Sequence, residues 1–448
     1  MDYIPHTTEE TYRMLRAVGL EHKEDLFAAI PCELRDPEIA LPPPSTEMDI
    51  TREMESAAKE NRGSEMVVFA GGGAYDHFIP QAVHALIGRG DFLTAYTPYQ
   101  PEASQGTLQA IYEFQSLICR LTGMEVCNAS MYDAATGLAE AALMACRITQ
   151  KETIIVSSTI NPRYRRVLHT YMGPPGIEVI EIPHDGGATD LAALRTCPLS
   201  DVAAVFVQNP NYYGILEQVG GIAEAVRDAR CLLGVVVYPH SLGLLKSPGE
   251  WGADLVVGDL QSLGLPLNYG GPYAGFIATR QTYVRQLPGR LAGRTRDKGG
   301  TTGYVLTLQT REQQIRRAKA TSNICTNQAL CALAATVYLS LLGAKGLRRA
   351  AELSVRKAHR LQARLSSVKG VRTLFNRPFF NEFLLDLPVP VSTFLKKACE
   401  ENLLAGVRVP PGEATERETL LVCATEKNDE AEIQRYAEIL GRVAAEIE

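Results

Sequence analysis

Short, nearly continuous apolar runs recur between residues 66 and 279, separated by longer segments in which apolar side chains return every three or four positions. Continuous runs are typical of strands covered on both faces, and the spaced pattern is typical of amphipathic helices. Their alternation predicts an α/β domain with a mainly parallel sheet. The predicted strands are Met66–Phe69, Thr153–Val156, Glu178–Ile182, Val202–Val207, Leu232–Tyr238, Leu255–Val257 and Tyr273–Thr279. The predicted helices between them are Gly106–Leu121, Ala134–Cys146 and Gly220–Arg227.

The two ends of the chain have different patterns. Residues 1–62 are helical in pattern but are broken by Pro31, Pro37 and Pro42–Pro44, which predicts an arm that wraps a neighbour. After Arg280 we expect no further strand of the sheet but a loop rich in Gly and Arg. The later elements are predicted as helices at 312–319, 328–342, 347–365, 392–401 and 429–446, and a strand at 382–387. The sequence thus predicts a helical arm (1–62), a large domain (63–330) and a small α+β C-terminal domain (331–448).

Composition narrows the class of protein. The 448 residues are 46% hydrophobic and 21% charged, with a formal net charge of −6, so the chain offers no basic field for nucleic acid. The ten cysteines form no C-x-x-C pair and have no nearby histidine, which predicts reduced thiols and no metal site. The longest apolar run, 329–344, is too short to span a bilayer, and the N-terminus has no leader pattern. We therefore expect a cytoplasmic protein with no membrane contact.

Polar side chains gather just before the first helix of the large domain. The stretch from Thr94 to Gly106 holds two tyrosines, two prolines and several amide or hydroxyl groups. A segment stiffened by prolines can present such groups to a small polar ligand. The same residues also fit a capped helix entrance, and the pattern does not separate the two interpretations.

A second polar turn, Asn128–Gly137, leads into an Ala-rich helix, where a phosphate can bind to free backbone N–H groups. Asp133 stands at the N-cap position, however, and its carboxylate would take those amides itself and repel a phosphate. A structural cap is the favoured interpretation. Gly71–Gly73 lacks the remaining spacing of a dinucleotide fingerprint and predicts a tight turn. His77 and His84 are seven residues apart on an expected helix face, where packing is favoured over ligation.

Several motifs in one order identify a family. They are Tyr96-Thr-Pro-Tyr-Gln-Pro-Glu, Asn128-Ala-Ser-Met-Tyr-Asp-Ala-Ala-Thr, Gln261-Ser-Leu-Gly-Leu-Pro-Leu-Asn-Tyr-Gly-Gly-Pro, Leu287-Pro-Gly-Arg and Arg317-Ala-Lys-Ala-Thr-Ser-Asn-Ile-Cys-Thr. The chain resembles, from end to end, the N-terminal half of glycine decarboxylase P-proteins. The resemblance implies the aspartate aminotransferase-like fold (fold type I) of PLP-dependent transferases. It also implies a role in the glycine cleavage system, where glycine is decarboxylated and its aminomethyl group passes to the lipoyl arm of H-protein.

The resemblance points to the subunit of a split P-protein that lacks the cofactor lysine. By spacing, the Schiff-base lysine position holds Gln261, whose amide cannot form an imine, and Tyr238 stands where such enzymes place an Asp beside the pyridine nitrogen. We therefore expect no cofactor bound by this chain alone, with pyridoxal 5'-phosphate (PLP) carried by the partner, subunit 2. Expected partners are subunit 2, lipoylated H-protein and glycine, in a heterotetramer that is inactive without subunit 2.

Two segments are expected to reach the partner's PLP pocket. They combine hydroxyl, amide and thiol groups, the second directly after a basic helix, which suits a small anionic ligand. Their candidate residues are Tyr96, Tyr99, Gln100, Ser104, Gln105, Thr321, Ser322, Asn323, Cys325 and Thr326. Two alternatives remain: a purely structural or regulatory partner that does not touch the active site, and an autonomous PLP enzyme using Lys246.

Overall fold

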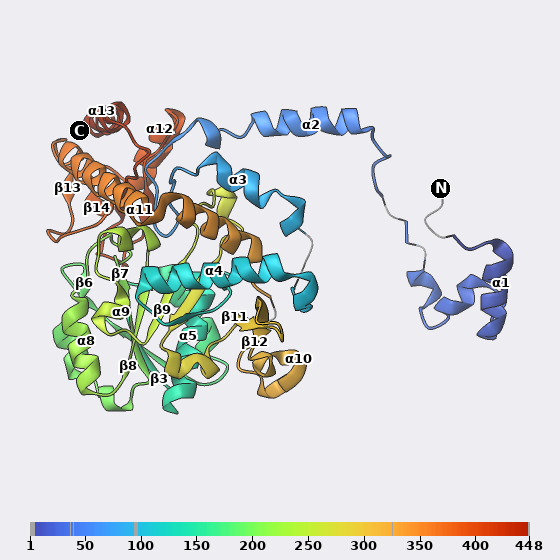
Figure 1. Ribbon diagram of the computed structural model, residues 1–448. Helices are drawn as coiled ribbons and strands as arrows, with labels where there is room; N and C mark the ends of the chain where they lie inside the picture. Colours follow the sequence, from blue (N-terminus) through green and yellow to red (C-terminus); the bar gives the residue numbers. More distant parts are fainter. Residues whose placement is uncertain (1–4, 36, 39, 94–96, 325, 447–448) are drawn as a thin grey trace. The chain divides into compact units, whose positions relative to one another are not determined.

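The computed structural model describes residues 5–35, 37–38, 40–93, 97–324 and 326–446 (Figure 1). The chain divides into two compact units, residues 1–64 and residues 65–448. The boundary expected near residue 330 remains a prediction.

The first unit consists of short helices with almost no core. Helix α1 (Thr8–Ala17) begins with a capping box between Thr7 and Glu10, and α2 (Glu47–Lys59) is capped by the Thr46 hydroxyl. Two 3₁₀ turns, Lys23–Phe27 and Cys32–Leu34, lie between them. Among the described residues of this unit only Leu15 is buried, while many apolar side chains are exposed, including Leu26, Phe27, Leu34, Leu41, Met48 and Met54.

A seven-stranded sheet forms the centre of the second unit, in the order β2-β10-β9-β8-β7-β3-β4. Four neighbouring pairs are parallel, and β10 is antiparallel to both β9 and β2. The bounds are β2 Val126–Cys127, β3 Thr153–Ser157, β4 Glu178–Ile182, β7 Ala204–Asn209, β8 Leu232–Val237, β9 Leu255–Asp259 and β10 Gly275–Thr279. Six of the seven predicted strands are thereby confirmed. The run at 66–69 is the exception, because β1 (Val67–Val68) pairs with β15 (Leu403–Leu404) outside this sheet.

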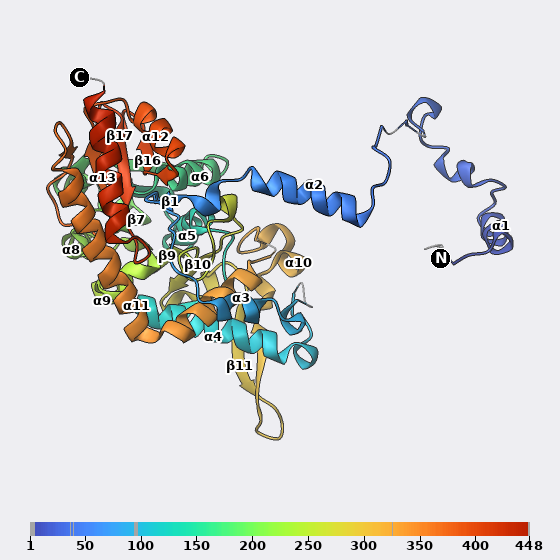
Figure 2. The ribbon, with the colours of Figure 1, turned by 90° about the horizontal axis from the view of Figure 1, so that it is seen from above.

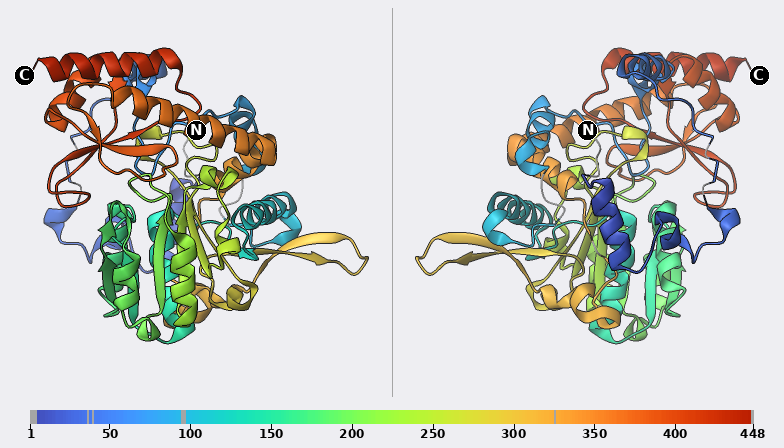
Figure 3. Two further views of the ribbon diagram at one scale, coloured as in Figure 1. Left: turned by 90° about the vertical axis from the view of Figure 1, so that its left-hand side faces the viewer. Right: turned by 90° about the vertical axis from the view of Figure 1, so that its right-hand side faces the viewer.

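Helices cover both faces of the sheet (Figures 1 and 3). One core contains Phe114 and Ile222 against Val205 and Val235, and the other contains Leu138 and Leu168 against Phe206 and Val236. Successive strand residues therefore face opposite cores, which explains their continuous apolar runs. The helices are α3 Gln81–Ile87, α4 Gln105–Thr122, α5 Ala134–Thr149, α6 Pro162–Met172, α7 Leu191–Thr196, α8 Val219–Asp228 and α9 Pro248–Trp251.

The region after Arg280 differs from the prediction. Instead of a loop, β11 (Leu291–Arg296) pairs antiparallel with β12 (Thr302–Thr307), and this hairpin projects from the body of the unit (Figures 2 and 3). Its turn is held by Asp297, whose carboxylate accepts from the Thr301 N–H. The single basic helix expected at 312–319 is also wrong, because Arg317 has a φ of +51° and separates α10 (Gln313–Arg316) from a 3₁₀ turn at 317–319.

The C-terminal part follows the predicted order. Helix α11 (Ala329–Leu365) joins the two predicted helices across a non-helical Gly343, and an antiparallel sheet of order β13-β14-β17-β16 packs beside it. The remaining bounds are β13 Arg372–Thr373, β14 Glu382–Asp386, α12 Val391–Glu400, β16 Val407–Val409, β17 Thr419–Cys423 and α13 Glu430–Ala445. By length and composition α11 is apolar enough to cross a membrane, but core helices of globular proteins have the same length and composition. In α11, 39% of the most apolar stretch is buried.

Candidate functional site

A small cavity lies at the carboxyl ends of β8 and β9, the edge at which sheets of this type bind ligands. Tyr238 directly follows β8 and Gln261 follows β9, and both line the cavity together with Tyr75 and Asp259. Its volume is about 20 Å³. That is room for about one water molecule, far less than a pyridine ring with a phosphate requires.

Gln261 is fully engaged within the protein. Its Oε1 accepts from the Tyr75 N–H at 2.7 Å, and its Nε2 donates to the carbonyls of Tyr75 and Leu265, both at 3.0 Å. The side chain is 1% exposed. The amide therefore ties the Tyr75 segment to the end of β9. That Gln261 stands at the lysine position of PLP enzymes remains a prediction from spacing.

Aromatic and imidazole rings fill the space around Tyr238. The Tyr75 ring stacks on Tyr238 with centroids 4.0 Å apart, and His77 stacks on His240 at 3.8 Å. His77 is hydrogen-bonded through Nε2 to the Tyr238 hydroxyl and through Nδ1 to the Glu426 carboxylate. Burial raises the pKa of Tyr238 well above that of a free phenol and lowers the pKa of His240, so both stay neutral. A neutral phenol cannot supply the negative charge that holds a pyridinium proton.

His77 corrects one expectation. It lies before α3 rather than on it, so it does not share a helix face with His84. The favoured interpretation, packing rather than ligation, agrees with its 5% exposure and its ring stacking. Within the described residues no group of three or more His, Cys, Asp or Glu side chains is arranged to hold a metal ion.

Two carboxylates occupy the N-terminus of α5. As predicted, Asp133 is the N-cap, and its Oδ1 accepts from the Thr136 N–H at 2.7 Å. Asp259 accepts from the Ala134 N–H at 3.2 Å. Burial raises the pKa of Asp259 to about 7, while hydrogen bonds from the N–H groups of Gln261 and Ala134 oppose the rise. These amides are already satisfied by acids, so the residues of this chain do not fit PLP at the ring, the imine or the phosphate.

The two segments predicted to serve the partner's pocket both contact one short helix, α10. The Tyr99 hydroxyl donates to Gln314 Oε1 at 3.0 Å, and Gln313 Nε2 donates to Asn323 Oδ1 at 2.9 Å. Both glutamines belong to α10. Tyr99 is 44% exposed, and Asn323 is exposed as well. Helix α10 therefore brings Tyr99 and Asn323 together on an accessible surface.

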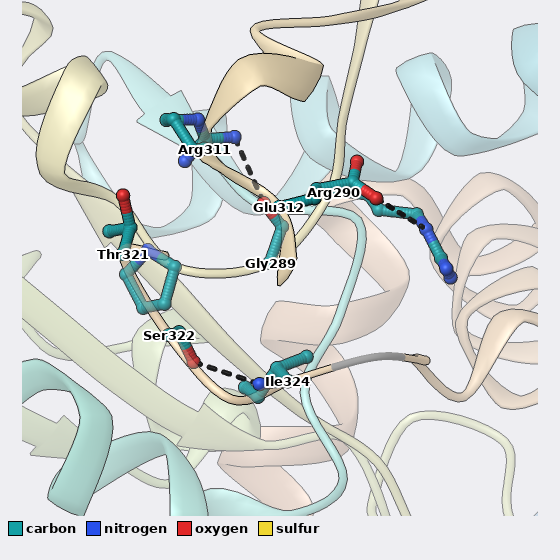
Figure 4. Close-up of a pocket in the computed structure, with 8 residues that line it drawn as sticks. Gly289, Arg290, Arg311, Glu312, Thr321, Ser322 and Ile324 are labelled. Atoms are coloured by element: carbon teal, nitrogen blue, oxygen red, sulfur yellow. Dashed lines mark hydrogen bonds and ion pairs between the residues drawn. The ribbon is translucent and has the colours of Figure 1, made fainter. Parts of the chain in front are cut away.

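The other predicted residues differ in what they contact. Gln105 is committed internally, since its Nε2 donates to the carbonyls of Pro101 and Tyr304, and Ser104 begins α4 without a side-chain cap. Ser322 accepts from the Ile324 N–H and lines a small pocket with Thr321 (Figure 4). Gln100 is exposed and Thr326 is half-buried. Tyr96 and Cys325 lie outside the described residues.

Sequence reasoning missed Arg290, which contacts Tyr99 of the first segment and Asn327, the residue after the second. It is 7% exposed, and Figure 4 draws it beside Glu312, with Nε 4.0 Å from the carboxylate. Its two terminal nitrogens donate to the Tyr99 hydroxyl and to Asn327 Oδ1, each at 3.4 Å. The motif Leu287-Pro-Gly-Arg contains this residue, but a lone arginine after a turn carries no spacing signal for a site.

The fold is that of the fold type I transferases: a mixed seven-stranded sheet, helices on both faces and a small C-terminal α+β part. A sphingosine-1-phosphate lyase of Burkholderia pseudomallei shares the fold at a TM-score of 0.66 and 15% identity, over 94% of both chains. The profile of the glycine cleavage system P-protein matches residues 1–440. This chain belongs to the glycine cleavage system P-protein family.

Individual relatives match over the whole chain. The probable glycine dehydrogenase (decarboxylating) subunit 1 of Moorella thermoacetica is 50% identical and that of Desulforamulus reducens 48%, each over 99% of this chain and 100% of the relative. The crystal structure of an inhibitor-bound glycine decarboxylase (P-protein) superposes with a TM-score of 0.90 at 47% identity. It covers 99% of this chain and 100% of that one.

Proposed function

We propose that this chain is subunit 1 of a two-subunit glycine decarboxylase and that it binds no PLP of its own. With a PLP-bearing subunit 2 it decarboxylates glycine and transfers the aminomethyl group to the lipoyl arm of H-protein. The observation that carries the proposal is that Gln261, predicted to stand at the lysine position, is an amide with three internal hydrogen bonds beside a cavity of about 20 Å³. The full-length similarity to proteins named as subunit 1 supports the assignment. We expect the complex in the cytoplasm.

In this proposal the chain contributes residues to the partner's site. Tyr99 and Asn323 are the best candidates, because both are exposed and both are fixed by α10. A substrate as small as glycine has few groups of its own to fix its orientation, so added hydrogen-bonding groups at fixed positions lower the barrier to reaction. Gln105 is better explained as a structural residue, because its side chain hydrogen-bonds the start of α4 to β12.

Two alternatives have weaker support. An autonomous enzyme would need another lysine, but Lys246 lies over the ring of Trp251, with Nζ 4.2 Å from the centroid. It is thus packed as a cation on an aromatic face. A purely structural partner would not need exposed Tyr99 and Asn323 side chains held by one helix, and the kinetics of variants at these two positions separate it from the proposal.

Substitution of the contributed side chains should impair turnover without dissociating the complex. Tyr99→Phe and Asn323→Ala should each leave the assembly and its PLP absorbance intact and lower glycine turnover by about tenfold or more, a loss of roughly 1.4 kcal/mol in transition-state stabilisation. The measurement is glycine–bicarbonate exchange with lipoylated H-protein on the co-expressed complex. Gln434→Ala, an exposed glutamine on α13, is the matched control. Wild-type kinetics in both site variants would support the purely structural role.

Assembly is the second expected result. Residues 1–64 contain 14 acidic and 7 basic side chains, and their exposed apolar residues have no core of their own to enter. Such a segment needs another surface, so we expect an obligate complex with subunit 2, an α2β2 heterotetramer. Light scattering of the co-expressed proteins should give the mass of the heterotetramer. A monodisperse monomer that ignores subunit 2 is the contrary outcome.

A further inference from the structure

Arg290 joins the first predicted segment to the residue that directly follows the second. One terminal nitrogen donates to the Tyr99 hydroxyl and the other to Asn327 Oδ1, each at 3.4 Å, and the guanidinium carbon lies 5.7 Å from the Tyr99 ring centroid. Tyr99 belongs to the first segment, and Asn327 directly follows the second. An arginine fork has fixed geometry, so these two contacts constrain the distance between the segments.

Four hydrogen bonds and two short stretches of sequence together connect these residues in a ring. From Arg290 they pass to Tyr99, from the Tyr99 hydroxyl to Gln314 at 3.0 Å, and from Gln313 to Asn323 at 2.9 Å. Asn323 and Asn327 belong to one stretch of chain, and Asn327 returns to Arg290. We call these residues the Arg290 ring: Arg290, Tyr99, Gln313, Gln314, Asn323 and Asn327.

The ring is anchored to the large domain on the Arg290 side. The Arg290 carbonyl accepts from the Ala129 N–H at 2.8 Å, and Asn327 Nδ2 donates to the Ala129 carbonyl and to Ser130 Oγ, both at 3.0 Å. Ser130 is fully buried and has a φ of +127°, a conformation that non-glycine residues hold only when their surroundings impose it. The anchor is therefore a rigid part of the fold, whereas Tyr99 and Asn323 on the far side of the ring are exposed.

We infer that Arg290 is a positioning residue for the reaction: it fixes Tyr99 relative to the anchored Asn327, so that the Tyr99 hydroxyl enters the partner's active site at a set position. This inference rests on the proposed function. Arg290 acts through Tyr99, and its fork geometry, not its charge alone, is what the role requires.

The test uses the co-expressed complex and compares Arg290→Met with Arg290→Lys. A lysine keeps the charge but replaces the planar fork by a single ammonium group, so both variants should lower kcat/KM by about tenfold while PLP absorbance and assembly stay intact. Because Arg290 acts through Tyr99, the double variant Arg290→Met with Tyr99→Phe should be no worse than Tyr99→Phe alone. Arg195→Met, an exposed arginine on α7, should behave as wild type.

The outcomes separate the two proposals. If Tyr99→Phe has wild-type kinetics, the proposed contribution of this chain to the site is wrong. Two other results would overturn only the positioning role. One is an impaired Tyr99→Phe whose kcat/KM falls further when Arg290→Met is added, and the other is full activity of Arg290→Lys. Should Arg290→Met fail to assemble, Asn327→Ala removes the other end of the fork contact and must show the same lack of additivity with Tyr99→Phe for the inference to stand.

Discussion

The purified chain, incubated with PLP and reduced with borohydride, should carry no stoichiometric pyridoxyl adduct on any one lysine, and it should not decarboxylate glycine. The reason is steric and chemical together: the cavity beside Gln261 and Tyr238 holds about 20 Å³, and the N–H groups at the start of α5 already bond to carboxylates. Mass spectrometry of the reduced protein and an absorbance scan near 400 nm measure the result. Co-expressed subunit 2 is the positive control.

Supplying the lysine should not change that outcome. Gln261→Lys alone adds an amine but leaves the Tyr75 ring stacked on Tyr238 and leaves Asp133 and Asp259 at the phosphate position. An electron sink needs the ring protonated and the phosphate anchored as well as the imine. Glycine decarboxylation by this single variant without subunit 2 would show that the pocket is more open than its packing indicates.

The strands of the central sheet were predictable because burial on both faces requires continuous apolar runs. The partner of a short strand was not: Val67–Val68 pairs with Leu403–Leu404, more than 330 positions along the chain, and no local pattern encodes that pairing. The β11–β12 hairpin escaped detection because much of it faces solvent, so glycine and arginine replace the apolar alternation of a core strand. The break at Arg317 follows from a positive φ that helix propensity does not reveal.

The candidate site likewise contains residues that the sequence predicts and contacts that it does not. The places of Gln261 and Tyr238 at the carboxyl ends of two neighbouring strands could be predicted, since each closely follows a predictable strand. Their partners could not, because Tyr75, His77 and Glu426 come from distant parts of the sequence and meet only in the folded chain. Arg290 was missed for a similar reason: its role depends on Tyr99 and Asn327, which precede and follow it by 191 and 37 positions.

Glu382 should make stability fall as pH rises. Its buried carboxyl accepts from the Gly72 N–H at 2.6 Å and from the Tyr75 hydroxyl at 2.8 Å, and burial raises its pKa from 4.5 to about 7 despite these hydrogen bonds. The folded state therefore holds a proton that the unfolded chain releases above about pH 4.5. The stabilisation is complete below that pH and is lost as pH rises to about 7, a change of roughly 3 kcal/mol.

Glu382→Gln should remove this dependence. The amide oxygen can still accept from Gly72 and the amide N–H₂ can donate to the Tyr75 oxygen, but no proton is released when the chain unfolds. In the co-expressed complex, urea midpoints of wild type and variant should lie closest near pH 5 and separate progressively towards pH 8, with the variant gaining relative stability.

The buried Asp259 acts in the same direction but is present in both proteins, so it cancels in the comparison. Glu53→Gln, an exposed acid on α2, should follow wild type at every pH. Parallel curves for wild type and Glu382→Gln would mean that Glu382 is ionised in the folded protein throughout this range, and that the contact between β14 and the Tyr75 segment is held by a charged rather than a neutral carboxyl group.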